Sequence, residues 1–509
     1  MDISMVMEAF QGILHPTMLI TIFIGVLVGI IAGCIPGFTF TMAIILAFPF
    51  TFGMDPVQGL ALMIGIYIGG LSGGLISGIL LGIPGTPSSV VTVFDGYPMT
   101  QQGQSARALG IGIMSSVLGT FIGAIVLFLL GPIIAKFSLL FGPWEIFSLI
   151  LFALTLVAGL SGASLAKGLL AGCLGLLIGT IGISPTGQVR FDFGISQLSS
   201  GFSPIPVLIG LFALSTLFSN IEEIKKSVAG KDTAILKQQV KIPYLQVLKD
   251  MYREKWNVLR SSLIGCFIGC LPAAGAESAN FISYDQAKKF SKDKERFGKG
   301  HPGGIVASES SNNAVAGGAF IPTITLGIPG DVAQAVMIGA LILHGITPGP
   351  GLFHTQPILV NSIYVAIIIS GVAVLLLQTL LLPILTRITF IPKEFLVPSI
   401  LFLSTVGAFA LNNQIFDIWI VFAFGIIGFL LMKMGVPLSP IILGLILGPT
   451  LEAEMTRAFQ MDTSISLFFT RPISLTFIIL ALGSFVFTVF QVNKQNKKTV
   501  EAIDIKKGA

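Results

Sequence analysis

Two identical glycine–proline strings interrupt long apolar stretches of this chain. Gly82-Ile83-Pro84-Gly85 lies within residues 57–97, and Gly327-Ile328-Pro329-Gly330 lies within residues 306–346. Proline removes a backbone donor and glycine permits positive φ, so both strings predict breaks in helices. A broken helix exposes backbone N–H groups, which bind anions such as carboxylates, and carbonyl groups, which bind cations such as Na⁺. The breaks are therefore the first candidates for a binding site.

A second pair of apolar segments carries turns of a similar kind. The segment 17–50 is interrupted at Pro36-Gly37, and the segment 257–284 is interrupted at Pro272–Gly275. These two segments align at an offset of 236, the Gly-Ile-Pro-Gly strings align at 245, and Pro206-x3-Gly210-Leu211 aligns with Pro440-x3-Gly444-Leu445 at 234. Because the order of motifs is kept, the sequence predicts two copies of one unit. Duplicated, Gly/Pro-broken apolar segments are typical of secondary transporters and indicate their binding sites.

Polar side chains lie beside all four breaks. Short hydroxyls and amides offer hydrogen bonds without the cost of burying a charge. We predict that the substrate or ion contacts come from these residues and from the break residues themselves: Pro36, Gly37, Thr39, Gly85, Thr86, Ser88, Ser89, Gly275, Glu277, Ser278, Asn312, Asn313, Pro329, Gly330 and Asp331. Other polar residues stand nearby, namely Thr92, Asp95, Asn280, Glu309 and Ser311. A Na⁺ site at the breaks is one expectation, with its ligands left open.

Several of these residues also have a simpler interpretation. An isolated Ser or Gly serves close packing, since small residues let membrane helices approach one another. Glu277 fits a cation ligand or proton carrier and fits equally a residue at a wet hairpin surface. Asp331 directly follows Pro329-Gly330, where an acid is a good helix cap. The Asn312-Asn313 pair together with the break residues favours a site over packing alone.

Catalytic chemistry has little support in the sequence. The four histidines are scattered without zinc spacing, and Gly82–Ser89 lacks the Gly-Lys-Ser/Thr of a phosphate-binding loop. Cys266 and Cys270 are four apart and could hold a soft metal, although small apolar filling is the better interpretation. No nucleophile–base pair is visible. We predict a protein that is no enzyme and has no cofactor, with an intramembrane Ser/Asp protease as an open alternative.

The composition places the chain in the membrane. Of its 509 residues, 53% are hydrophobic and 10% are charged, whereas a soluble domain carries about 25% charged residues. We therefore expect an all-α polytopic membrane protein. In a membrane protein, a formal charge of +5 indicates topology rather than a binding partner. Because the basic residues flank the spans, nucleic acid is not an expected partner. Residues 1–16 have acids but no Lys or Arg, which predicts a short amphipathic helix at a membrane surface rather than a cleavable signal peptide.

Charge distribution predicts the topology. Eleven spans are expected, at 57–97, 108–131, 145–160, 168–183, 203–219, 306–346, 358–382, 395–411, 415–432, 437–450 and 472–492. Positive charge marks the cytoplasmic side. Basic runs bracket the segment 257–284 on both sides, so it must enter and return as a re-entrant hairpin. The segment 17–50, flanked only by acids, is expected to be a hairpin entering from outside.

This topology divides the chain into two inverted repeats, each with a re-entrant hairpin and a Gly-Pro-broken transmembrane helix. The expected boundaries are 1–219 for the first repeat, 220–256 for a cytoplasmic basic loop, 257–455 for the second repeat and 456–509 for a final span and tail. The N-terminus lies outside and the C-terminus inside. On this scheme 25 Lys/Arg are inside and four are outside (Lys136, Arg190, Arg457 and Arg471), which sums to the 29 present.

The chain resembles the large membrane subunit of the tripartite tricarboxylate transporters (TctA-type). The strings that carry the resemblance are GIPGTPSSVVTVFDGYPM at 82–99, QQGQSARALGIG at 101–112, ESSNNAVAGGAFIPTITLGIPG at 309–330 and LILHGITPGP at 341–350. It extends over about residues 16–455. It implies a bacterial inner-membrane carrier driven by Na⁺ or H⁺, a small four-helix membrane partner, and a periplasmic or extracellular solute-binding protein that delivers a carboxylate.

The expected function is import of a tricarboxylate or other organic carboxylate by the permease subunit of a secondary transporter. The sequence departs from the family at Pro272-Ala273-Ala274-Gly275, where Pro-Gly-Ala-Gly is common, and at Glu277 and Asp331, where small hydroxyl residues are usual. These departures leave the acid unidentified. An intramembrane enzyme, a channel and a non-transporting scaffold are the alternatives.

Overall fold

The computed structural model describes residues 3–160, 164–224, 241–272, 274–389, 393–486 and 488–489. Within these residues the chain is helical, apart from one antiparallel ladder between β1 (Gly182–Ile183) and β2 (Val189–Arg190). Six described helical stretches are long and apolar enough to cross a membrane: Pro16–Cys34, Pro56–Leu81, Ser105–Ser138, Pro204–Glu222, Pro357–Ile388 and Ile415–Lys433. The predicted all-α membrane class is confirmed.

The remaining predicted spans are helical too, but they are shorter or more polar. Five of them contain apolar helices at Pro143–Gly159, Leu165–Gly179, Val332–Leu343, Val397–Asn412 and Pro472–Val486. The stretch predicted to end at residue 450 continues as a helix to Met461, because Pro449 lies within the helix without ending it. The C-terminal lysines and residues 225–240 of the basic loop 220–256 lie outside the described residues.

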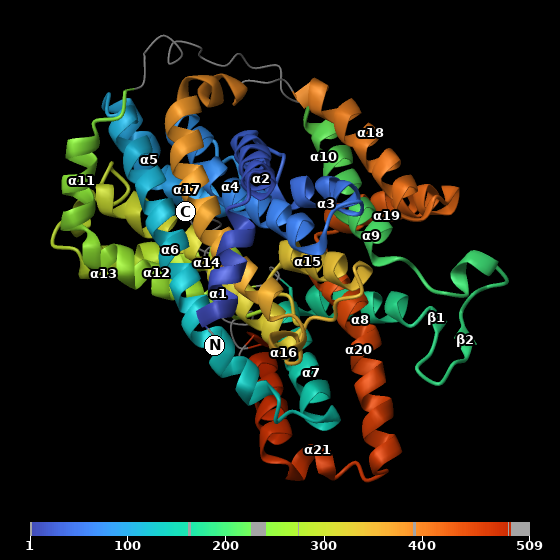
Figure 1. Ribbon diagram of the computed structural model, residues 1–509. Coiled ribbons are helices and arrows are strands. Elements are labelled where there is room, and N and C mark those ends of the chain that lie inside the picture. The colour runs from blue at the N-terminus through green and yellow to red at the C-terminus, as the bar shows by residue number, and fades with distance from the viewer. Residues whose placement is uncertain are drawn as a thin grey trace, which may run out of the picture. The chain divides into compact units, whose positions relative to one another are not determined.

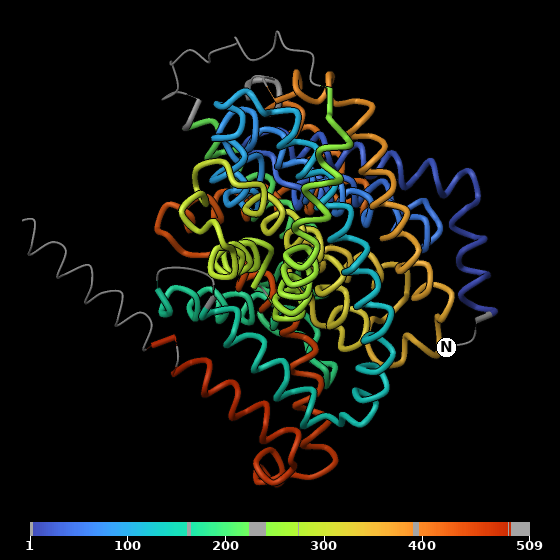
Figure 2. Tube along the Cα trace, turned by 90° about the vertical axis from the view of Figure 1, so that its left-hand side faces the viewer, coloured from blue at the N-terminus to red at the C-terminus, as the bar shows by residue number. Residues whose placement is uncertain are grey.

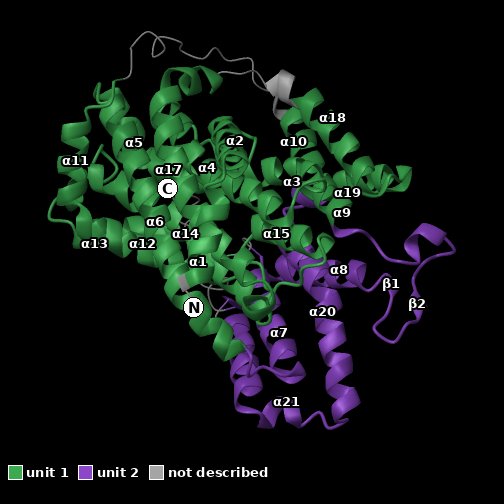
Figure 3. Cartoon of the chain, viewed as in Figure 1, with its two compact units in different colours: residues 1–138, 205–429 green, residues 139–204, 430–509 purple. Residues whose placement is uncertain are grey.

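The chain forms two compact units (Figure 3). Unit 1 contains Met1–Ser138 and Ile205–Phe429, and unit 2 contains Leu139–Pro204 and Leu430–Ala509. Each unit combines segments from both halves of the sequence. The residue boundaries of the two units therefore differ from those of the two predicted repeats.

Unit 1 holds most of the helices (Figure 1). They are α1 (Ile3–Ile13), α2 (Pro16–Cys34), α3 (Phe40–Thr51), α4 (Pro56–Leu81), η1 (Pro87–Ser89), α5 (Val90–Gln101), α6 (Ser105–Ser138), α9 (Pro204–Leu208), the π-helical turn η3 (Ile209–Leu214), α10 (Ser215–Ile224), α11 (Tyr244–Arg253), α12 (Lys255–Gly269), α13 (Gly275–Phe290), η5 (Lys294–Arg296), α14 (Pro302–Leu326), α15 (Val332–Leu343), α16 (Leu352–Thr355), α17 (Pro357–Ile388), α18 (Lys393–Asn412) and α19 (Ile415–Lys433).

The predicted helix breaks are present in unit 1. α4 ends at Leu81 and α14 ends at Leu326, each followed by a glycine in the left-handed region, Gly82 at φ 67° and Gly327 at φ 70°. A residue with a side chain is strained there, so glycine ends both helices. The chain also leaves helical geometry between α2 and α3 and between α12 and α13.

Small residues let α2 approach α4 so closely that the backbones touch, and α12 approaches α14 in the same way (Figures 1 and 2). A Cβ atom on Gly29 would lie 2.2 Å from the Ile66 carbonyl oxygen, and one on Gly265 would lie 2.4 Å from that of Ser311. Gly33 and Gly269 make matching approaches, 2.4 Å from the oxygen of Gly70 and 2.5 Å from that of Val315. Next to them, the Sγ atoms of Cys34 and Cys270 each lie 3.4 Å from a carbonyl oxygen, of Gly73 and Gly318 respectively. These cysteines are small helix fillers that face a neighbouring backbone.

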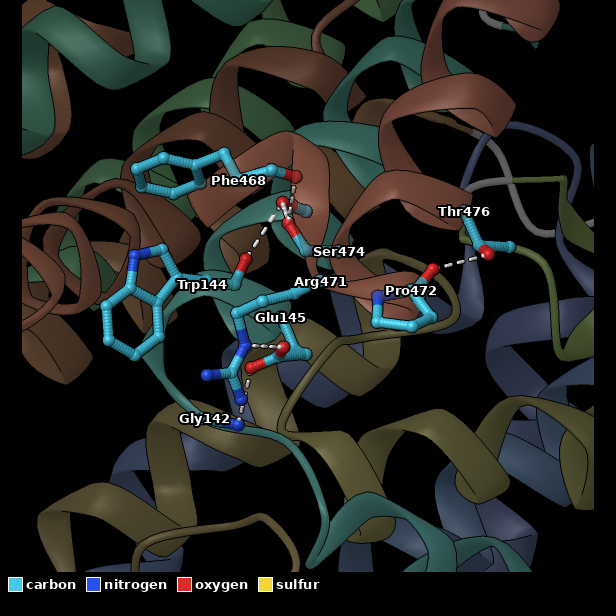
Figure 4. Close-up of polar contacts among 9 residues, drawn as sticks. Gly142, Trp144, Glu145, Phe468, Arg471, Pro472, Ser474 and Thr476 are labelled. Atoms are coloured by element: carbon cyan, nitrogen blue, oxygen red, sulfur yellow. Dashed lines mark hydrogen bonds and ion pairs between the residues drawn. The ribbon is translucent and has the colours of Figure 1, made fainter. Parts of the chain in front are cut away.

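Unit 2 consists of α7 (Pro143–Leu160), α8 (Leu165–Gly179), the β1–β2 ladder, η2 (Ser196–Leu198), α20 (Ser439–Met461), α21 (Leu467–Thr470) and the helix Pro472–Val486. A buried carboxylate ties its two chain segments together (Figure 4). Glu145 accepts a hydrogen bond from Arg471 Nε at 2.5 Å and one from the Gly142 N–H at 2.9 Å. The guanidinium of Arg471 lies 4.8 Å from the ring centroid of Trp144.

Replacing Arg471 with alanine is expected to destabilise the protein by about 3 kcal/mol, because it leaves the carboxylate of Glu145 buried with one backbone donor. The Glu145 side chain is 3% exposed. Lys289→Ala is the matched control, since Lys289 and its partner Asp285 are 62% and 56% exposed, and its loss should cost less than about 1 kcal/mol. Thermal unfolding of the purified protein in detergent measures both, and equal losses would contradict the prediction.

Candidate functional site

The four helix breaks lie in unit 1, and the segments that follow the two Gly-Ile-Pro-Gly breaks pack against helices of the other half of the sequence. The first Gly-Ile-Pro-Gly break is followed by η1, which contacts α13, the second arm of the segment 257–284. The second Gly-Ile-Pro-Gly break is followed by α15, which contacts α3, the second arm of the segment 17–50, and also α4. Each break in one half of the sequence therefore meets a helix of the other half.

The first break is held by its own hydroxyls. The Thr86 N–H donates to Ser89 Oγ at 3.2 Å, and Ser89 Oγ donates to the Thr86 carbonyl at 2.8 Å. The hydroxyls of Thr86 and Ser88 are 3.1 Å apart. A Cβ on Gly85 would lie 2.0 Å from the Gly33 oxygen at the end of α2. All four predicted residues of this break are thus buried together, and two of the hydroxyls are used in capping.

Asn280 joins the first break to α14. Its Nδ2 donates to the Ser88 carbonyl at 2.6 Å, and its Oδ1 accepts from Ser311 Oγ at 2.5 Å. Asn280 is fully buried. The sequence placed it beside the second hairpin tip, but its partner in the other half of the chain had no sequence signal.

Asn312 and Asn313 lie on the buried middle of α14. Asn312 Nδ2 donates to the Leu71 carbonyl of α4 at 2.8 Å, and Asn313 Nδ2 donates to the Glu309 carbonyl at 3.2 Å. The Oδ1 atom of each is buried and has no hydrogen-bond partner among the described residues. Leaving two buried carbonyl oxygens unpaired at one level of a helix costs free energy of folding, unless a solute or ion binds them.

The second break places Asp331 against α4. Asp331 caps α15 by accepting from the Gln334 N–H at 2.9 Å, which confirms the capping role expected from sequence. Its other carboxylate oxygen accepts from the hydroxyl of Tyr67. The side-chain amide of Gln334 is buried without a hydrogen-bond partner in the described part of the chain. Tyr67 was missed by the sequence reasoning, because it stands as a lone tyrosine in the glycine-rich helix α4.

Pro329 and Gly330 are buried at the second break. A Cβ on Gly330 would lie 2.7 Å from Ala319 Cβ in α14 and 2.9 Å from the Gly269 oxygen at the end of α12. This is the counterpart of Gly85, which touches α4 and the end of α2.

The tip between α2 and α3 is partly exposed. Gly37 has φ 90°, and its carbonyl accepts from Asn220 Nδ2 of α10 at 3.1 Å. Thr39 caps α3 by accepting from the Met42 N–H at 3.2 Å. Pro36 precedes them and is half-buried. The predicted residues of this tip shape the turn, and Thr39 is used as a cap.

The tip between α12 and α13 contributes the fewest polar contacts to the candidate site. Gly275 has φ 66° and opens α13. Glu277 is exposed and Ser278 half-buried, and neither makes a hydrogen bond within the described residues. The structure therefore brings Gly275 to the turn but does not bring Glu277 to the other predicted side chains.

The polar partners of these side chains are hydroxyls, amides, carboxylates and backbone groups. Among the described residues no Lys or Arg hydrogen-bonds to them. Backbone dipoles and neutral donors are the groups that such an arrangement offers to a solute, and an anion held by them calls for a cation nearby.

Comparison with known proteins gives one family and two relatives. The family model described as "Tripartite tricarboxylate transporter TctA family" matches residues 19–443. An Agrobacterium vitis protein described as an uncharacterized 52.8 kDa protein in the TAR-I ttuC' 3'region is 34% identical over 466 residues, 91% of each chain. A second Agrobacterium vitis protein, described as an uncharacterized protein in the TAR-II ttuC' 3'region, is 36% identical over 219 residues, 43% of this chain and 90% of its own length. No solved structure matches.

Proposed function

This chain belongs to the tripartite tricarboxylate transporter TctA family, and we propose that it is the large permease subunit of a binding-protein-dependent secondary transporter. Its family is one of multi-pass transporter subunits and not of enzymes. The proposed cargo is a tricarboxylate or another organic carboxylate, driven inward by Na⁺ or H⁺. Its proposed partners are a small four-helix membrane subunit and a solute-binding protein on the outer face.

The observation that carries this proposal is that the segment after each Gly-Ile-Pro-Gly break packs against helices of the other half, while Asn312 and Asn313 lie on the buried middle of α14. Broken helices turn backbone N–H and C=O groups toward one cavity, which is how secondary transporters hold anions and ions. The buried, unpartnered Oδ1 atoms of both asparagines support a bound solute or ion at this level of α14. We propose Thr86, Ser88, Ser89, Asn312 and Asn313 as contacts.

Matching contacts support two copies of one unit. The offset of 236 carries Gly29 to Gly265, and the offset of 245 carries its partner Ile66 to Ser311, so the contact Gly29–Ile66 corresponds to Gly265–Ser311. The same offsets carry the Cys34–Gly73 contact to Cys270–Gly318. A structural correspondence of this kind is expected from duplication and is difficult to explain by helix packing in general.

We further propose that the copies are inverted, with both ends of the segment 257–284 in the cytoplasm and the N-terminus outside. Transport would then move the site between the two faces while the binding protein delivers the acid from outside. Na⁺ or H⁺ would neutralise the charge of the acid, since no basic side chain does so in the described site.

The topology gives a direct test. Cysteines replacing Lys241 and Lys292, both exposed, are expected to react with a membrane-impermeant maleimide from the same, cytoplasmic face of the membrane. Inside-out and right-side-out vesicles with a cysteine-free background measure the side. Labelling from opposite faces would overturn the re-entrant segment and the inverted arrangement with it.

The function is tested by uptake into proteoliposomes that contain the chain and its four-helix partner, with the binding protein outside. A panel of labelled organic acids, citrate first, is expected to show one acid whose uptake saturates, needs the binding protein and supports counterflow. Saturation and counterflow exclude a channel. Absence of uptake for every acid that the binding protein retains would favour a scaffold or an intramembrane enzyme.

A further inference from the structure

A buried carboxylate on α14 has no role in the function proposed so far. Glu309 lies on α14, and its side chain is completely buried. Its oxygens contact hydroxyls from two other helices: Oε1 lies 2.5 Å from Thr92 Oγ1 of α5, and Oε2 lies 3.0 Å from Ser116 Oγ of α6. Thr92 follows Ser89 of the first break by three residues. Glu309 therefore joins three helices beside the proposed site.

The hydroxyls around Glu309 form a chain that reaches the backbone. Thr92 Oγ1 lies 3.0 Å from Ser308 Oγ, and Ser308 Oγ lies 3.1 Å from the carbonyl oxygens of both Gly304 and Ile305. Each hydroxyl has one proton to donate and can accept as well. The direction of the whole chain therefore depends on whether Glu309 carries a proton.

Both protonation states satisfy the chain with the same heavy-atom positions. With Glu309 ionised, Ser308 donates to Thr92, and Thr92 and Ser116 donate to the carboxylate. With Glu309 protonated, its O–H donates to Thr92, Thr92 donates to Ser308, and Ser308 donates to the Gly304 or Ile305 carbonyl, while Ser116 still donates to Oε2. A proton added at Oε1 reverses two hydrogen bonds, forms the one from Ser308 to a backbone carbonyl, and breaks none.

Among the described residues, no cation contacts the ionised form of Glu309. The polar side chains that interact with Glu309 are the hydroxyls of Thr92 and Ser116 and the neutral amide of Asn312, within the described part of the chain. Charged groups on the neighbouring helices have other partners: Asp95 of α5 accepts from Tyr284 and from three backbone N–H groups, and Arg107 of α6 pairs with Asp250. Burying an ionised carboxylate without a cation costs free energy. Uptake of a proton removes this cost, because it neutralises the side chain.

The other titratable groups on the elements packed against α14 do not contact Glu309. Tyr67 of α4 bonds Asp331, and Cys266 of α12 faces the Ala314 carbonyl. The remaining titratable side chains on these elements make no hydrogen bond or ion pair with Glu309 within the described residues. They are Tyr97, Lys136, Lys255, Arg260, Glu277, Asp285, Lys288, Lys289 and His354.

We propose that Glu309 is the group that takes up and releases the coupling proton, with Thr92 and Ser308 as a relay that adapts to either state. The inference rests on the proposed function for its role in transport. In each cycle an O–H bond forms on Oε1 with a proton from the outer side, and the same bond breaks when the proton leaves on the inner side.

The protonation is tested first without any substrate. Infrared difference spectra of the full chain, recorded between acid and alkaline pH, are expected to show a carboxylic C=O stretch that disappears in Glu309→Gln. Thr92→Val should shift this band, because it removes the acceptor of the acid proton. Asp285→Asn is the matched control, since Asp285 is exposed and pairs with Lys289, and it should leave the band in place. A band unchanged in Glu309→Gln would overturn the proposal.

The coupling is tested in proteoliposomes with the acid that the panel identifies. Glu309→Gln is expected to lose at least tenfold in net uptake driven by a pH gradient in Na⁺-free buffer, while it retains exchange of internal for external acid. Retained pH-driven net uptake in this variant, or wild-type uptake that follows a Na⁺ gradient and ignores pH, would overturn the proposal. Failure of the proposed function looks different, because the wild type would then transport no acid while the infrared result stands.

If Glu309→Gln does not fold, Thr92→Val still decides the matter, since it keeps the carboxyl and removes the relay. Its net uptake is expected to move to a different pH range while exchange is retained. An unchanged pH profile would overturn the relay.

Discussion

Asn313→Ala is expected to lower uptake at least a hundredfold while leaving the protein as stable as the wild type. A hundredfold loss corresponds to about 2.7 kcal/mol of lost stabilisation of the transported solute or ion. Uptake into proteoliposomes and thermal unfolding in detergent measure the two quantities on the same preparation.

The reason is the unusual state of the Asn313 amide. Its Oδ1 is buried without a partner in the described residues, and its Nδ2 returns only to the Glu309 carbonyl one turn earlier in the same helix. An unpaired buried carbonyl costs about 1–3 kcal/mol in the empty protein, which offsets the packing lost on truncation to alanine. A side chain kept for folding would show the opposite result, with lower stability and a proportionate loss of uptake.

Ser310→Ala is the matched control for this variant. Ser310 is as deeply buried on the same helix, but its hydroxyl is satisfied by the Val306 carbonyl. Its uptake is expected to stay within about twofold of the wild type. Normal uptake by Asn313→Ala, or an equal loss in Ser310→Ala, would remove Asn313 from the binding site.

The positions of the helix breaks could be predicted from sequence because their cause is local. Proline alone does not break these helices: Pro98 lies within α5, Pro132 within α6 and Pro322 within α14. The breaks occur where a glycine adopts positive φ and proline follows two residues later, as at Gly82 and Gly327. Composition likewise predicted the helical class, because an uncharged stretch long enough to span lipid has few other solutions.

The partners across the site could not be predicted, because they depend on how helices far apart in sequence pack. Asn280 bonds a carbonyl 192 residues away, and Tyr67 bonds an acid 264 residues away. Periodicity says which face of a helix is apolar but not which helix it meets. Glu277 shows the converse, since its place beside a tip left a contact and a wet surface equally open; its side chain is exposed, and α13 presents Asn280 to the break.

The second large effect is expected where the two Gly-Ile-Pro-Gly breaks press against their neighbours. Gly85→Ala should abolish uptake and destabilise the protein by about 1–3 kcal/mol, because its Cβ would lie 2.0 Å from the Gly33 oxygen and 2.6 Å from Ser77 Oγ. Both are closer than atoms can approach, and one of them is backbone, so α2 and the break must move apart. Thr86 and Ser88, which follow Gly85 directly, would move with the break.

Gly330→Ala should cause the same kind of defect with a smaller magnitude. Its nearest atoms are Ala319 Cβ at 2.7 Å, Ala319 Cα at 2.8 Å and the Gly269 oxygen at 2.9 Å, so the overlap is smaller than at Gly85, although the backbones of α12 and α14 must still move. Gly351→Ala is the control, since a Cβ there meets nothing within 4 Å and its φ is not positive. Uptake rates and unfolding midpoints are compared for all three variants.

If the two breaks are equivalent parts of one duplicated unit, uptake should fall in the order Gly351→Ala, Gly330→Ala, Gly85→Ala. A Gly330→Ala variant as active as the Gly351→Ala control would confine the solute to the first break and contradict a site shared by both copies.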